Sequence, residues 1–131
     1  MISDLHKESS AAKEFKGRTG FTRIACAAGY SRAGLAAAFR GEAAFRQLIL
    51  LNLLLLPTTL LLDISSLERA LLILVGLLTL VVELLNSAIE STVDRISLDL
   101  HPLSAQAKNM GSAAQLVMLT IAGLVWITVL L

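Results

Sequence analysis

The sequence predicts an all-α integral membrane protein with an N-terminal amphipathic surface helix and three transmembrane helices. Apolar residues make up 56% of the 131 residues, charged residues make up 16%, and the mean hydropathy is +0.76. Soluble domains average roughly 45–50% apolar and about 25% charged residues. The apolar residues also gather in three long stretches, so the composition favours one membrane domain over a soluble protein.

The first 40 residues are predicted to stay outside the hydrocarbon core. Residues 1–19 mix charges with Ser and Ala without a clear period, so we predict a mobile tail there and a membrane domain over 20–131. In the segment of about 21–40, apolar residues at helical spacing are interspersed with arginines. This pattern is typical of an amphipathic helix that lies in the headgroup zone.

Three spans follow, and their predicted boundaries are about 42–62, 67–96 and 104–131. The first span contains Pro57, which lacks an N–H group, and the two threonines after it are placed to help satisfy the backbone. A tight turn with a serine cap is predicted before the second span, with Glu68 in the first helical turn. Ser104 is the candidate cap of the third span.

The distribution of positive charge predicts the orientation of these spans. Eight of the 11 Lys and Arg residues precede Gln47, where the uncharged part of the first span begins, and Arg95 and Lys108 flank the loop between the second and third spans. Cytoplasmic loops carry the excess of Lys and Arg in membrane proteins. We therefore predict that the N-terminus and the second loop are cytoplasmic.

An acidic face on the second span is the candidate site. Glu83 follows 13 uncharged residues and precedes six more, and an ionisable group at such depth usually faces a protein interior or a watery cavity. The residues that share its helix face, at spacings of three, four and four, are Glu83, Asn86, Glu90 and Asp94. Glu83 is suited to act as a general base, and Glu90 is suited to bind a hard cation with a partner such as Glu42.

The predicted topology also brings cations to this acidic face: Arg23, Arg32, Arg46, Arg95 and Lys108. Carboxylates for Mg²⁺ beside cations for phosphate are the ingredients of phosphoryl transfer. No P-loop and no G-x-G-x-x-G fingerprint is present, so ATP would need a different kind of site. The alternative for Glu83 is a structural role, as a hydrogen-bonding partner between helices or as part of a proton path.

Five motifs occur in one order along residues 20–131. They are Gly20-Phe-Thr-Arg23, Ala27-Ala-Gly-Tyr30, Glu42-Ala-Ala-Phe-Arg-Gln47, Glu83-Leu-Leu-Asn-Ser-Ala-Ile-Glu90 with Val93-Asp-Arg95, and Lys108-Asn-Met-Gly-Ser-Ala-Ala114. In sequence and order they resemble the prokaryotic diacylglycerol kinase family of small integral membrane lipid kinases. Several motifs in register make this resemblance far more specific than any one of them.

The resemblance implies a homotrimer in the bacterial inner membrane, with active sites between neighbouring subunits at the cytoplasmic interface. It implies MgATP-dependent phosphorylation of the free hydroxyl of diacylglycerol to phosphatidic acid, with no nucleic acid as a partner. Glu83 matches the catalytic base, and Glu42 and Glu90 match the carboxylates that bind Mg²⁺. The residues at nucleotide-contacting positions are Arg23, Tyr30, Asp99, His101, Lys108 and Asn109. Those at positions near the lipid are Arg46, Gln47, Asn86 and Ser112.

Two positions depart from the family pattern, and two other functions remain open. Asn109 stands where the family usually has Asp, so a negative charge is lost, and Leu48 stands where close relatives often have an acidic residue. Undecaprenol kinase is an alternative within the same fold, because the segment Leu100-His-Pro-Leu103 resembles that branch. A non-enzymatic membrane oligomer that uses Glu83 as a buried contact between helices is an alternative from another class.

Overall fold

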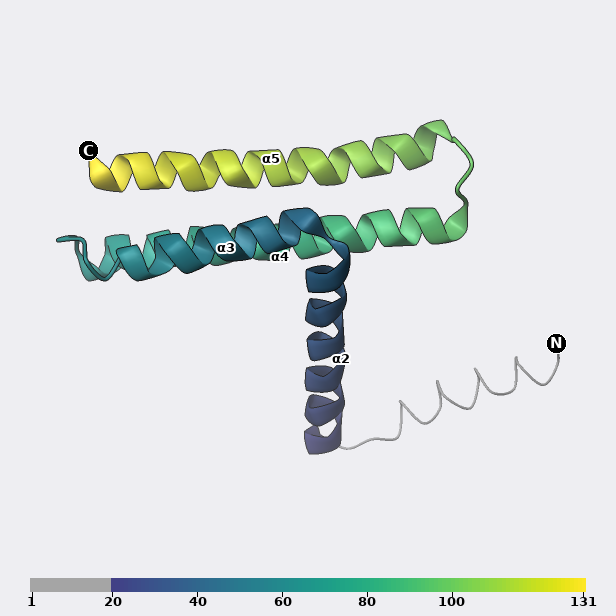
Figure 1. The fold of residues 1–131 in the computed structure, drawn as a ribbon, viewed down its shortest axis with the longest axis horizontal. Coiled ribbons are helices and arrows are strands. Elements are labelled where there is room, and N and C mark those ends of the chain that lie inside the picture. The colour runs from purple at the N-terminus through teal and green to yellow at the C-terminus, as the bar shows by residue number, and fades with distance from the viewer. Residues whose placement is uncertain (1–19) are drawn as a thin grey trace. The chain divides into compact units, whose positions relative to one another are not determined.

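The computed structural model describes residues 20–131, so the tail expected over 1–19 lies outside the described residues. The described helices, in chain order, are α2 (Gly20–Gly41), α3 (Ala43–Thr58), α4 (Ser66–Ile96) and α5 (Pro102–Leu130) (Figure 1). Residues 20–131 contain no strand. The all-helical fold class is thus confirmed for this part of the chain, and a helix, α2, covers the segment predicted over about 21–40; its place at the membrane surface stays a prediction.

The chain divides into two units, and each is described by itself. The first ends at Ala37 and the second is Ala38–Leu131. Within the first unit, every described side chain of α2 is at least partly exposed, including the apolar Phe21 and Ile24. The buried core therefore belongs to the second unit.

Helix α3 is shorter than the first predicted span, because its regular bonding ends just after Pro57. Its 16 residues end at Thr58, and the N–H groups of Leu60 and Leu61 donate to carbonyls three residues back, each at 3.0 Å. This tighter pattern is common where a helix ends. The Thr58 hydroxyl donates to the Leu54 carbonyl at 2.9 Å and the Thr59 hydroxyl donates to the Leu56 carbonyl at 2.7 Å. The threonines thus bond the backbone around Pro57, although neither of these bonds runs to the Leu53 carbonyl, which the proline cannot bond.

Helix α4 begins at the predicted serine cap. The Ser65 hydroxyl accepts from the Glu68 backbone N–H at 3.3 Å, and the Glu68 carboxylate accepts from the Ser65 N–H at 2.7 Å. This reciprocal pair is a capping box. The Arg69 side chain then donates to the carbonyls of Thr59 and Leu62, at 2.9 and 3.2 Å, and so joins the start of α4 to the end of α3.

Helix α5 begins two residues earlier than predicted, and its cap is His101 rather than Ser104. The Nδ1 atom of His101 accepts from the Leu103 backbone N–H at 3.2 Å, and Pro102 is the first residue of the helix. Proline suits this position because its ring fixes a helical φ and its missing N–H would have no helical partner. Pro102 thus starts the helix, and the residue before it becomes the cap.

The buried side chains mark the faces on which α3, α4 and α5 pack. On α4 they recur every three or four residues, at Leu72, Val75, Thr79, Glu83 and Ser87. The buried residues of the other two helices are Phe45, Leu48 and Asn52 on α3, and Gly111, Gln115 and Met118 on α5. Helix α4 contacts both neighbours (Figure 1). It is therefore the central helix of the second unit, and Glu83 lies on its buried stripe.

Two helices among the described residues, α4 and α5, are long and apolar enough to cross a membrane. They have 31 and 29 residues, and their most apolar windows have hydropathies of 2.3 and 2.1. Only 22% and 6% of these windows is buried within the chain, whereas the core helix of a soluble protein is mostly buried. Helix α3, with 16 residues, falls short of the roughly 20 residues that a span needs. The structure thus supports two of the three predicted spans by length.

Candidate active site

Glu83 is the most enclosed ionisable group in the described part of the second unit. Its side chain is 4% exposed, on the face of α4 that packs against the neighbouring helices. The charges of Glu42 and Glu90 both act on its carboxyl group. The three acids that the sequence indicated are therefore electrostatic neighbours, although Glu42 lies 41 positions before Glu83 in the chain.

Glu42 sits where α2 ends and α3 begins. It occupies the N-cap position of α3 with an extended backbone, yet its carboxylate makes no capping hydrogen bond. The junction is held by Arg46, whose guanidinium donates to the carbonyls of Phe39 at 2.9 Å and Arg40 at 3.1 Å. A basic side chain on the last carbonyls of a helix is a common way to stabilise its end. The carboxylate of Glu42 is thus not used by the helix end and could bind a cation.

Asn86 and Glu90 form a polar pair one and two turns after Glu83. The Asn86 amide nitrogen donates to the Glu90 carboxylate at 3.2 Å, so one bond orients both side chains. The Asn86 oxygen is buried and has no hydrogen-bond partner among the described residues. Gly111 of α5 lies directly opposite, and a Cβ atom there would collide with this oxygen. The glycine therefore lets α5 approach α4 closely beside the acids.

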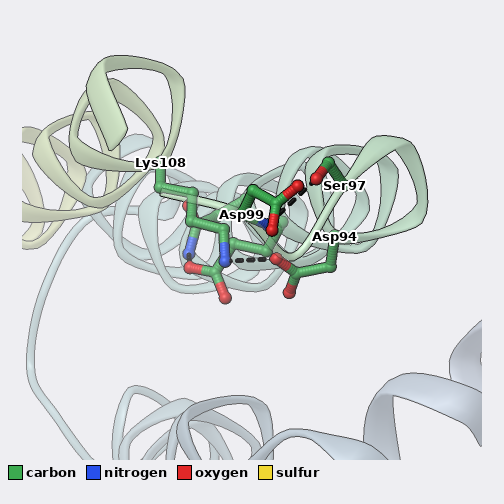
Figure 2. A network of polar contacts seen from close by, with 6 residues as sticks. Asp94, Ser97, Asp99 and Lys108 are labelled. Atoms are coloured by element: carbon green, nitrogen blue, oxygen red, sulfur yellow. Dashed lines mark hydrogen bonds and ion pairs between the residues drawn. The ribbon is translucent and has the colours of Figure 1, made fainter. Parts of the chain in front are cut away.

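A second group of polar residues surrounds the loop between α4 and α5. An open pocket of about 440 Å³ is lined there by Asp94, Asp99, His101 and Lys108, among others. The Lys108 ammonium pairs with the Asp94 carboxylate at 2.6 Å, and the Asp99 backbone N–H donates to the Ser97 hydroxyl at 2.9 Å (Figure 2). Three of the residues predicted to contact a nucleotide are thus brought to one pocket.

Asp94 is the residue of this pocket to which the sequence assigned no site role. It shares the acidic face of α4, but its partner Lys108 lies 14 residues away across the loop. The sequence does indicate this ion pair, because an acid near the end of one helix and a base near the start of the next lie close together when the two helices are antiparallel. His101 has a second role that the sequence did not indicate, as the cap of α5.

The other predicted site residues are placed as follows. Arg23 and Tyr30 lie seven residues apart on α2, in the first unit, and therefore share one face of that helix. Both are exposed. In the second unit, the exposed residues are Arg46, Gln47, Asn109 and Ser112. The contacts predicted for these six with nucleotide or lipid stay predictions.

The acids fit a magnesium ion that arrives with phosphate groups. Within residues 20–131 no group of three or more His, Cys, Asp or Glu side chains converges as a metal site. Magnesium is usually held by one or two carboxylates, with phosphate oxygens and water completing its shell. Glu42 and Glu90 supply that number of carboxylates, and neither is fully buried.

Comparison with known proteins gives a consistent family assignment. A family model described as prokaryotic diacylglycerol kinase matches residues 29–130. A diacylglycerol kinase of Pseudomonas aeruginosa is 66% identical over 117 residues, which cover 89% of this chain and 95% of that protein. A diacylglycerol kinase of Escherichia coli K12 is 51% identical over 82% of this chain and 88% of its own length. One of Haemophilus influenzae is 44% identical over 82% and 92%. All the predicted site residues except Arg23 fall within the matched range, and the chain belongs to the prokaryotic diacylglycerol kinase family.

Proposed function

We propose that the chain is a kinase that uses MgATP to phosphorylate the free hydroxyl of diacylglycerol, giving phosphatidic acid. The observation that carries this proposal is its identity of 66% and 51% with proteins named diacylglycerol kinase, over 89% and 82% of its length. The buried Glu83 beside two further acids supports it chemically, because a kinase of this kind needs a base and charge neutralisation at one place.

Glu83 is the proposed general base. The hydroxyl oxygen of diacylglycerol forms a bond to the γ-phosphorus of ATP while its proton passes to the Glu83 carboxylate. The bond from that phosphorus to the bridging oxygen breaks, and ADP leaves. Because Glu83 is 4% exposed, little water reaches it, which favours transfer to the lipid alcohol over hydrolysis of ATP.

Glu42 and Glu90 would hold Mg²⁺ in this scheme, and the ion, when bound with ATP, neutralises charge on the phosphate oxygens. Asn86 orients Glu90 through the bond of 3.2 Å. The unpartnered Asn86 oxygen is an acceptor enclosed beside the acids, and a buried acceptor of this kind is satisfied when a ligand or water donates to it. This supports its proposed place near the polar end of the lipid, with Arg46, Gln47 and Ser112 at the surface around it.

The nucleotide is proposed to enter at the pocket between α4 and α5. Lys108 supplies a cation for phosphate, and Asp99 and His101 line the same pocket of about 440 Å³. Asn109, Arg23 and Tyr30 complete the proposed set. Asp94 holds the Lys108 ammonium at the pocket wall through the ion pair of 2.6 Å.

We place the protein in the bacterial inner membrane as a multi-pass homotrimer whose N-terminus is cytoplasmic. The low buried share of α4 and α5 supports contact with lipid and with other copies, because their large apolar side chains otherwise face outward. This location would bring ATP from water and diacylglycerol from the bilayer to the same boundary.

A lipid-substrate assay tests the proposal. The purified full chain is incubated with γ-labelled ATP, Mg²⁺ and either a short-chain diacylglycerol or undecaprenol. We expect labelled phosphatidic acid and little labelled undecaprenyl phosphate. Preferential labelling of undecaprenol would move the chain to the other lipid, and no labelled lipid at any concentration would favour the non-enzymatic membrane oligomer.

A further inference from the structure

Three uncharged polar side chains are buried where the helices are otherwise apolar, and the proposed mechanism uses none of them. Each comes from a different helix: Asn52 from α3, Thr79 from α4 and Gln115 from α5. Their side chains are 6%, 3% and 9% exposed, respectively. Polar groups at such positions are retained where they bond across helices, because lipid and apolar side chains offer no alternative partner.

Thr79 joins the three helices. Its hydroxyl accepts from the Asn52 amide nitrogen at 3.2 Å, which links α3 to α4. Its backbone carbonyl accepts from the Gln115 amide nitrogen at 3.3 Å, which links α5 to α4. The Asn52 amide also donates to the Leu48 carbonyl at 2.9 Å, and the Thr79 hydroxyl donates to the Gly76 carbonyl at 2.6 Å. We call Asn52, Thr79 and Gln115 the interhelical clamp.

Gly76 makes the approach of α3 to the clamp possible. A Cβ atom on Gly76 would lie 2.5 Å from the Asn52 side-chain oxygen and 3.0 Å from a Leu56 methyl group. A larger residue would therefore displace the Asn52 side chain and disturb its bond to Thr79. Small residues at helix contacts in membranes serve this purpose.

The α4 residue of the clamp lies about one helical turn before Glu83. Thr79 precedes Glu83 by four residues and belongs to the same buried stripe of α4. In an α-helix the N–H of a residue is directed at the carbonyl four positions earlier, so the carbonyl that Gln115 binds is also the helical acceptor for Glu83. Apolar contacts are non-directional and tolerate rotation or sliding, whereas these hydrogen bonds have a fixed geometry.

We propose that Asn52, Thr79 and Gln115 are positioning residues, which fix the rotation and depth of α4 so that the Glu83 carboxylate meets the lipid hydroxyl. This inference rests on the proposed function of Glu83 as the base. The proposed reaction assigns the clamp no contact with substrate, and the hydrogen bonds described for its side chains run to Leu48, Gly76 and to one another rather than to the acids. Its Gln115 oxygen has no partner among the described residues, so Gln115 acts through its amide nitrogen.

Kinetics on the full chain test the clamp. Thr79→Val keeps the shape of the side chain and removes the hydroxyl, and we expect kcat to fall about three- to tenfold, the effect of one interhelical hydrogen bond. The KM for MgATP should stay near its wild-type value, because the residues of the clamp do not line the proposed nucleotide pocket. Thr79→Ser should restore kcat, since it restores the hydroxyl. Gln115→Met, which removes only the amide, should also lower kcat.

A matched control separates this effect from the loss of any threonine hydroxyl in the membrane. Thr120 of α5 is exposed, and its hydroxyl bonds only the Leu116 carbonyl of its own helix among the contacts described, at 2.9 Å. Thr120→Val should leave kcat unchanged. The proposal is overturned if Thr79→Val and Gln115→Met match this control, or if Thr79→Ser fails to restore turnover.

A measurement that needs no turnover keeps the clamp separate from the proposed reaction. Dicyclohexylcarbodiimide adds to protonated carboxyl groups in apolar surroundings, and mass spectrometry measures its rate of addition to Glu83. We expect Thr79→Val to raise this rate, because a less constrained α4 exposes the carboxyl group, and Thr120→Val to leave it unchanged. A rate in Thr79→Val at or below that of the wild type overturns the clamp. An inactive wild type with the expected rates would overturn only the proposed function.

Discussion

The acids around Glu83 and the interhelical clamp are built from similar parts that are connected differently. In each region a glycine of one helix faces an asparagine of another: Gly111 faces Asn86, and Gly76 faces Asn52. At the acids, the asparagine bonds Glu90 of its own helix α4. At the clamp, the asparagine bonds Thr79 of the neighbouring helix. The close approach of two helices thus belongs to the proposed active site in one region and to the interhelical clamp in the other.

This difference explains how one bundle can combine rigidity with reactive groups. Around Glu83, α4 and α5 are brought together by shape at Gly111, which leaves the Asn86 oxygen without a protein partner. Around Thr79, the amide nitrogens of two side chains are already engaged by α4. A region whose polar atoms remain available can bind substrate only if a neighbouring region fixes the helices. The following substitutions test this division, from the largest expected effect to the smallest.

Glu83→Gln should remove the proposed general base and leave the interhelical clamp intact. The amide keeps the size of the side chain but cannot take the proton, so we expect turnover to fall by roughly 10²–10⁴-fold, the usual contribution of a general base. Labelled phosphatidic acid is the readout, and the elution volume in size-exclusion chromatography should be that of the wild type. Turnover near that of the wild type would show that Glu83 is not the base.

Gly111→Ala should lower activity by steric displacement, because it adds a methyl group and removes no polar group. The new Cβ atom would collide with the Asn86 oxygen, and the displacement needed to relieve the collision would move Asn86 and Glu90. Overpacking of this kind costs about 1–3 kcal/mol, more than the gain of about 0.5–1 kcal/mol from replacing a helical glycine by alanine. We expect a lower melting temperature and turnover reduced by roughly tenfold or more.

Gly123→Ala is the control for this change. Gly123 lies on the same helix, and a Cβ atom there would meet nothing within 4 Å. The helical preference of alanine should then raise stability slightly, with turnover unchanged. Equal losses in the two variants would mean that glycine is required along α5 in general, and that the contact with Asn86 is not the cause.

Much of this architecture follows from the sequence, because long apolar stretches with few charges leave few alternatives. Glu83 was identified by the charge-free residues on both sides of it, and the structure places it on the buried face of α4. The capping box at Ser65 and Glu68 follows from local chemistry. The end of α3 was harder to predict, since Pro57 sits inside the helix and the chain changes its bonding pattern only after it.

The interhelical clamp could not be read from periodicity. Its two links join residues 27 and 36 positions apart, and one sequence does not say which helix faces meet. Asn52, Thr79 and Gln115 are also polar residues within apolar runs, but uncharged polar residues are common in membrane helices and so indicate a site less strongly than the charge of Glu83 does. His101 was missed as a cap because serine is favoured there, whereas Pro102 fixed the start of the helix.

Gly76→Ala should act on the clamp as Gly111→Ala acts on the site. The added Cβ atom would lie 2.5 Å from the Asn52 oxygen, so the Asn52 side chain must shift and its bond to Thr79 is disturbed. We expect a loss of stability of about 1–3 kcal/mol, measured by thermal unfolding in detergent, and a smaller loss of turnover than in Gly111→Ala. A loss of turnover larger than in Gly111→Ala would reverse the roles assigned to the two regions.

Asp94→Asn should have the smallest effect on stability, because it removes a pair that is open to water. The Lys108 and Asp94 side chains are 38% and 48% exposed, and exposed ion pairs contribute about 0–1 kcal/mol. Thermal unfolding should therefore shift by no more than this amount, and raising the salt concentration should reduce the difference from the wild type, since salt screens exposed charges. A loss of stability as large as that of Gly76→Ala, unchanged by salt, would mean that the ion pair of Asp94 and Lys108 holds α4 and α5 together. The clamp would then share its structural role with a region we assign to the nucleotide.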